Sequence, residues 1–68
     1  MEPDNDLLSP EVLDEDGVAA RYKVTARTVK RWRAQRTGPR HFYAGRHVRY
    51  HREDIEQWEK AERVKAAS

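Results

Sequence analysis

Basic side chains are concentrated in the middle of the 68-residue chain. Eleven basic side chains and no acidic one lie between residues 17 and 52, whereas residues 1–16 carry seven acidic side chains and no basic one. Residues 53–68 carry five acidic and three basic side chains, so the net charge of +2 conceals a cationic centre between acidic flanks. The positive charges of such a centre repel one another, and binding to a polyanion relieves that repulsion. The cations are interleaved with Tyr22, Trp32, Phe42, His47 and Tyr50, which favours nucleic acid over a merely solvated surface.

The densest part of this cationic centre is a predicted helix over residues 26–36, with Thr25 as its N-cap and Gly38 and Pro39 beyond its end. At about 100° per residue, Val29 and Trp32 share one face and are expected to be buried. The opposite side is expected to carry groups that hydrogen-bond base edges or phosphates, helped by free N–H groups at the helix start. The predicted DNA contacts of this helix are Thr25, Arg27, Thr28, Lys30, Arg31 and Gln35.

Residues 40–50 alternate in polarity and predict a β-hairpin. We expect a three-residue loop at residues 43–45, because Gly45 in its third position supplies the positive φ that such loops require. This register places Phe42, Val48 and Tyr50 on the packed face of the hairpin and His41, His47 and Arg49 on the outer face. The predicted DNA contacts of this basic wing, to phosphates and the minor groove, are Arg40, Arg46, His47 and Arg49.

Two further helices are expected to position these groups. Acidic residues before residue 18 favour a helix over about residues 15–22, in competition with a start at Ser9 and Pro10. If residues 9–12 form only a turn, that turn lays the apolar side chains of Leu7, Leu8, Val12 and Leu13 on the core. A short link at residues 23–25, with the small Ala19 at the crossing, then predicts a helix-turn-helix.

The last predicted helix spans residues 52–63 and buries Ile55 and Trp58. Its exposed side is expected to carry the ion pairs Glu56–Lys60 and Glu59–Arg63. Residues 1–6 are expected to form a disordered acidic tail, residues 7–63 one domain, and residues 64–68 a frayed tail.

Several classes of protein are excluded by composition. The chain lacks cysteine, and His41, His47 and His51 without a placed carboxylate do not form a closed zinc site, so we expect no metal and no cofactor. No apolar run approaches a membrane span, the acidic start is unlike a secretory signal, and Trp32 lacks the Leu/Phe face of a membrane-surface helix. We therefore expect a soluble, cytoplasmic protein. No catalytic set or phosphate loop is present, so the enzyme class is rejected.

Two segments together resemble the excisionase-type, MerR-like winged helix-turn-helix DNA-binding domains. They are residues 18–32 (VAARYKVTARTVKRW), and residues 37–40 (TGPR) with 45–58 (GRHVRYHREDIEQW). The resemblance spans about residues 7–60 and departs from the family pattern at Gly17, where a good helix former is usual. It implies a mainly α fold with a small β-hairpin, a second helix in the major groove of double-stranded DNA with Thr28 and Arg31 touching it, and a wing on the flanking groove.

The resemblance also implies a role. A winged helix of this small size resembles the excisionases, which are also called recombination directionality factors. Excisionases bind repeats near an attachment site, bend DNA and direct an integrase toward excision. Neighbouring copies along the DNA are then further partners, and a bacterial, phage or mobile-element origin is expected. The alternatives are a small MerR-like transcription regulator at promoter repeats, and a protein-interaction module or anti-repressor that uses the acidic arm.

Overall fold

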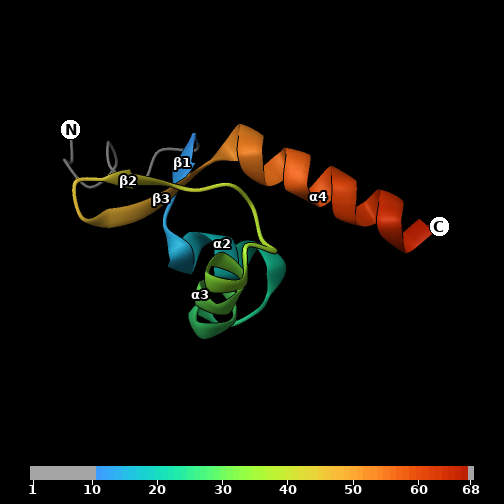
Figure 1. Cartoon of the computed structure of the whole chain (residues 1–68), viewed down its shortest axis with the longest axis horizontal. Helices are drawn as coiled ribbons and strands as arrows, with labels where there is room; N and C mark the ends of the chain where they lie inside the picture. The colour runs from blue at the N-terminus through green and yellow to red at the C-terminus, as the bar shows by residue number, and fades with distance from the viewer. Residues whose placement is uncertain (1–10, 68) are drawn as a thin grey trace.

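Residues 11–67 are described by a computed structural model, in which three helices pack beside a small antiparallel sheet (Figure 1). The elements follow the order β1 (Val12–Leu13), α2 (Glu15–Tyr22), α3 (Ala26–Gln35), β2 (Phe42–Ala44), β3 (His47–His51) and α4 (Arg52–Ala67). This mainly helical architecture with a β-hairpin confirms the predicted fold class. The predicted tail at residues 1–6, the alternative helix start at Ser9 and Pro10, and the core positions expected for Leu7 and Leu8 lie outside the described residues.

α2 and α3 each begin at a polar side chain that accepts a backbone N–H. Oδ1 of Asp14 accepts the N–H of Gly17 at 2.8 Å, and Oγ1 of Thr25 accepts the N–H of Thr28 at 3.2 Å. Each bond satisfies one of the four N–H groups that a helix start leaves without a partner. The predicted helix at Glu15–Tyr22 and the predicted N-cap of α3 are therefore confirmed.

The ends of α2 and α3 are formed by basic residues with left-handed backbone. Lys23 and Arg36 have φ angles of 56° and 58°. In both cases the next residue donates its N–H at 2.9 Å to the carbonyl five residues earlier, which is the pattern of a Schellman motif. α3 consequently ends at Gln35, before Gly38 and Pro39 are reached.

A short strand, β1, was not predicted; it begins at Val12, the last residue of the segment for which a turn was one of two alternatives. Val12 lies opposite His51 and Leu13 lies opposite Tyr50, so β3 is the central strand of the order β1-β3-β2. The N–H of Arg52 extends this ladder by donating to the carbonyl of Glu11 at 2.8 Å. β1 therefore carries the chain from one edge of the sheet directly into α2.

The hairpin has a different register from the predicted one. Gly45 and Arg46 form a two-residue turn, in which Gly45 alone has a positive φ, 66°, as a type II′ turn requires at its first central position. Ala44 therefore pairs with His47 and Phe42 pairs with Arg49. The three-residue loop at residues 43–45 was wrong, because a two-residue turn better matches the twist of the flanking strands.

The new register exchanges two side chains between the faces of the hairpin. Phe42 shares the face of Arg49 and is 41% exposed, so its predicted packing against the helices was wrong. His41, predicted to point outward, is half-buried instead, with its ring centroid 6.2 Å from that of Tyr50. Val48 and Tyr50 face the core as predicted.

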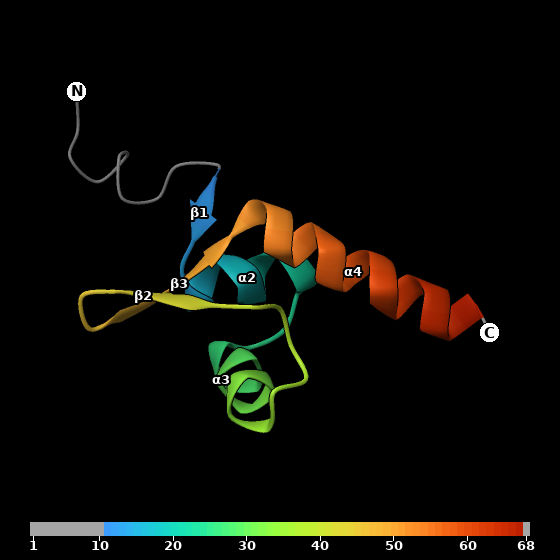
Figure 2. The same ribbon diagram turned by 45° about the horizontal axis from the view of Figure 1, so that its top comes forward.

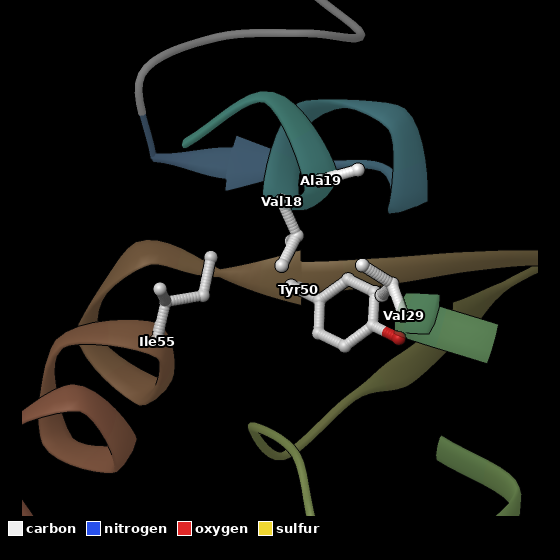
Figure 3. Packing of buried hydrophobic residues seen from close by; sticks show 5 residues of the cluster. All are labelled: Val18, Ala19, Val29, Tyr50 and Ile55. Atoms are coloured by element: carbon white, nitrogen blue, oxygen red, sulfur yellow. The ribbon is translucent and has the colours of Figure 1, made fainter. Parts of the chain in front are cut away.

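One hydrophobic core joins the helices to β3 (Figure 3). Its buried members come from α2, α3, β3 and α4, and are Val18, Ala19, Val29, Tyr50 and Ile55. Beside it, the Trp58 ring lies 5.1 Å from Trp32 and 5.3 Å from Tyr22, and its Nε1–H donates to the carbonyl of Thr37 at 2.8 Å. These contacts fix α4 against the helix pair.

α4 continues beyond the core. It extends to Ala67, so residues 64–67, expected to fray, are helical, and the predicted end at Arg63 was too early. Glu59 pairs with Arg63 at 3.8 Å as predicted, whereas Glu56 pairs with Arg52 at 3.8 Å. The hairpin tip and the end of α4 lie at opposite ends of the molecule, with α2 and α3 between them (Figure 2). Within residues 11–67, no helix is both long and apolar enough to span a membrane.

Candidate nucleic-acid interface

α3 turns its cations toward solvent. Val29 is fully buried and Trp32 is half-buried, whereas Arg27, Lys30 and Arg31 are exposed. Gln35, at the end of the same helix, is exposed as well. The first turn of α3 contains no acidic residue, so nothing within that turn offsets the partial positive charge of the helix start. This surface suits an anionic partner.

The hydroxyls of Thr25 and Thr28 already form hydrogen bonds at the start of α3. Their Oγ1 atoms are 3.0 Å apart, and the hydroxyl of Thr25 also accepts the Thr28 N–H. One of the two hydroxyl hydrogens is used in the mutual bond, so only the other is available to donate to a phosphate. Thr25 is exposed and Thr28 half-buried.

The hairpin brings three of its predicted DNA contacts close to α3. Arg46 occupies the turn at the tip, and His47 and Arg49 follow on β3. Together with Lys30, these residues border one hollow between α3 and the hairpin. Arg46 and His47 are exposed, whereas Arg49 is half-buried and its Nη1 donates to the carbonyl of Val48 at 2.7 Å.

Three carboxylates border the same hollow, which sequence reasoning did not anticipate. Asp14, Glu15 and Asp16, from the start of α2, line it together with the basic residues of the hairpin. Asp14 caps α2, Glu15 is bound by Arg33, and Asp16 is exposed. The sequence identified these acids as a helix start but gave no signal of their place beside the hairpin.

Three of the eleven central cations form ion pairs with carboxylates elsewhere in the domain. Arg21 lies 3.7 Å from Glu59, Arg33 lies 2.7 Å from Glu15, and Arg52 lies 3.5 Å from Glu11. Hydrogen bonding to Glu15 raises the pKa of Arg33 above its already high ordinary value. The other cations of this block form no ion pair within residues 11–67; they are Lys23, Arg27, Lys30, Arg31, Arg36, Arg40, Arg46 and Arg49.

Arg40 lies apart from the other predicted wing contacts. It precedes β2 and is exposed, and it borders a second hollow near the C-terminal end of α3, with Arg33 and Arg36. The structure thus gathers the predicted contacts along α3 and the hairpin tip and places Arg40 at the hairpin base. Arg36 was not among the predicted contacts; its only sequence signal was membership of the basic block.

Comparison with known families adds an independent finding. A family model described as a helix-turn-helix domain matches residues 12–63. The matched segment runs from β1 into α4, so it includes both the α2–α3 pair and the hairpin. A search of curated proteins finds no match.

Proposed function

Because this chain belongs to the helix-turn-helix domain family, we propose that it binds double-stranded DNA with α3 in the major groove. The observation that carries this proposal is α3 itself, whose exposed side bears Arg27, Lys30 and Arg31 without a neighbouring acid in its first turn. The major groove is about 12 Å wide and admits a helix of this kind. A domain of this family is typically non-enzymatic.

The roles of the contacts follow from their positions. Arg27 and Arg31 project from α3 opposite its buried side and reach base edges, where a guanidinium binds guanine O6 and N7 with two hydrogen bonds. Arg46 and His47, at the hairpin tip, contact backbone phosphates beside the site. Thr25 and Thr28 use one hydroxyl hydrogen in their mutual hydrogen bond, and the other hydroxyl hydrogen donates to a phosphate at the start of α3.

The finer proposal is an architectural excision factor. Its support is the resemblance of residues 18–32 and 37–58 to excisionase-type domains, together with cations on both α3 and the hairpin. Several copies on adjacent repeats share the cost of bending, which is about 1–6 kcal/mol for a 20–30 bp site bent by 40–90°. The partners of this activity are DNA, other copies of the chain and an integrase.

DNA binding is tested by salt titration on a random-sequence duplex and on a duplex selected from a random library. If about six phosphates are neutralised, log affinity falls against log salt with a slope near −5. A slope near zero would contradict DNA binding and favour a protein-interaction module.

The excision role is tested on the selected duplex. Circular-permutation gel shifts should show a bend that grows with occupancy, and an integrase assay should show excision that depends on this protein. A straight complex with unchanged recombination and altered transcription from a nearby promoter would favour the regulator instead.

A further inference from the structure

A second basic hollow lies at the C-terminal end of α3, outside the recognition surface and the hairpin tip. Three arginines border it, Arg33, Arg36 and Arg40, beside the apolar surfaces of Trp32 and Pro39. No carboxylate is among the described residues that line it. We propose that this hollow binds a DNA backbone phosphate through Arg36 and Arg40, an assignment that rests on the proposed DNA binding.

The charge in this hollow favours an anion. Arg33 is neutralised by Glu15 at 2.7 Å, whereas Arg36 and Arg40 are exposed and form no ion pair in the described part of the chain. Two free guanidiniums therefore outweigh the partial charge of about −0.5 at a helix C-terminus. Asp54 borders a neighbouring hollow with Arg40, but the two do not form an ion pair.

Two of the carbonyls near this helix end are already hydrogen-bonded to the backbone. The last carbonyls of α3 would repel an anion if they were free. Here the carbonyl of Arg33 accepts the Arg36 N–H at 3.2 Å, and the carbonyl of Trp32 accepts the Thr37 N–H at 2.9 Å. These two carbonyls are therefore engaged by the N–H groups of the Schellman motif, which weakens their repulsion of an anion.

Arg36 keeps its side chain at a position where glycine is the unstrained residue. Its φ of 58° lies in the left-handed region, which costs a residue with a Cβ more than it costs glycine. Lys23 has the same backbone at the end of α2, so this conformation by itself assigns no task to Arg36. It does make glycine the replacement that removes the guanidinium without straining the backbone.

The two hollows differ in their acidic neighbours. The hollow beside the hairpin includes Asp14 and Asp16 as well as its cations, whereas the hollow at the end of α3 includes no acid among its described lining residues. Phosphate is therefore repelled less at the end of α3. A phosphate contact at the C-terminal end of α3 therefore adds to the contacts that the hairpin tip makes with the DNA backbone.

The first test compares Arg36→Gly with wild type on the random-sequence duplex. Glycine removes the guanidinium and relieves the backbone, so the melting temperature should be maintained or raised while the salt slope falls by about 1. Lys23→Gly reports the stability effect of the same backbone change, and Lys60→Ala, an exposed cation on α4, is the charge control and should leave the slope unchanged. An unchanged slope in Arg36→Gly overturns the assignment.

The second test locates the phosphate. Single methylphosphonate linkages, which are uncharged, are placed at each position of the selected duplex. One linkage should weaken wild-type binding and have no further effect on the Arg36→Gly/Arg40→Ala double variant. If every linkage weakens both proteins equally, this assignment fails while DNA binding stands. If wild type itself shows no salt-dependent binding, the proposed function and the assignment fail together.

Discussion

Arg33 of α3 and Glu15 of α2 form the shortest ion pair between helices in the described part of the chain, with Arg33 Nε donating to Glu15 Oε2 at 2.7 Å. Their side chains are 26% and 15% exposed, so solvent screens the pair less than an ordinary surface salt bridge. The pair fixes the orientation of α3 relative to α2. Arg33 is thus a positioning residue within a helix whose other cations face solvent.

Replacement of Arg33 should therefore act on stability. We expect Arg33→Ala to lower the free energy of unfolding by about 2 kcal/mol, because a hydrogen bond between charged groups is lost and Glu15 remains without its partner. Urea denaturation measures this effect. Glu15→Gln and the double variant complete a mutant cycle, which should give a coupling energy of at least about 0.5 kcal/mol. Strictly additive losses would contradict a direct interaction.

Local signals in the sequence predicted the helix pair well. Thr25 as N-cap, the acids before residue 18 and the spacing of Val29 and Trp32 each act within a few residues, and they placed α2 and the start of α3 correctly. β1 was missed because its two residues are too short for a periodic pattern, and its partner, β3, lies more than 35 positions away. The hairpin register was missed because the positive φ of Gly45 fits more than one loop.

The candidate site shows the same limit. Exposure of Arg27 and Arg31 follows from helical periodicity alone. The pairing of Arg33 with Glu15, across 18 positions, and the hollow shared by Arg36 and Arg40 depend on how α3 packs in three dimensions. The sequence therefore identified the cationic surface but could not separate the cations that stabilise the fold from those left free.

Gly38 is required by the close approach of Trp32. A Cβ at position 38 would lie 2.8 Å from the Trp32 Cβ, an atom too near the backbone to move aside. Gly38→Ala should cost about 1–3 kcal/mol of stability by overpacking. It should also change tryptophan fluorescence, because Trp32 packs against Trp58. Gly45→Ala is the control. Its positive φ makes alanine strained there, so stability should fall, but nothing lies within 4 Å of the added Cβ, so tryptophan fluorescence should not change.

The hydroxyl of Tyr50 is buried, and among the described residues it has no hydrogen-bond partner. The charged groups that act on it are Glu15, which raises its pKa, and Arg33, which lowers it. Burial, and secondarily the Glu15 carboxylate, raise the pKa of Tyr50 above 10.0. The folded state therefore holds this proton more tightly than the unfolded state. The resulting stability is fully present below the unfolded pKa and is lost as pH rises from there through the folded pKa.

Tyr50→Phe should consequently flatten the loss of stability in alkali. Between about pH 9 and about pH 11 the variant should lose less unfolding free energy than wild type. Near neutral pH it should be as stable as wild type or more stable by about 1 kcal/mol, since no buried hydroxyl remains unpaired. Tyr22→Phe should differ, because the Tyr22 hydroxyl donates to Glu59 at 2.7 Å and its loss is destabilising at neutral pH. Urea denaturation across this pH range distinguishes the two variants.

The division between base contacts and phosphate contacts can be measured at two arginines in different elements. Arg31 is exposed on α3, opposite the side that buries Val29, and Arg46 lies in the turn at the hairpin tip. Arg31→Ala should cost about 1–3 kcal/mol on the selected duplex and much less on a scrambled one, because a bidentate base contact is lost. Arg46→Ala should weaken binding to both duplexes equally and lower the salt slope by about 1, since a phosphate contact carries no sequence information. Titration of both variants on both duplexes at several salt concentrations separates these effects, and Lys60→Ala on α4 controls for the loss of one charge. Equal losses of specificity in Arg31→Ala and Arg46→Ala would show that the hairpin reads sequence as α3 does, and the assignment of roles would then be wrong.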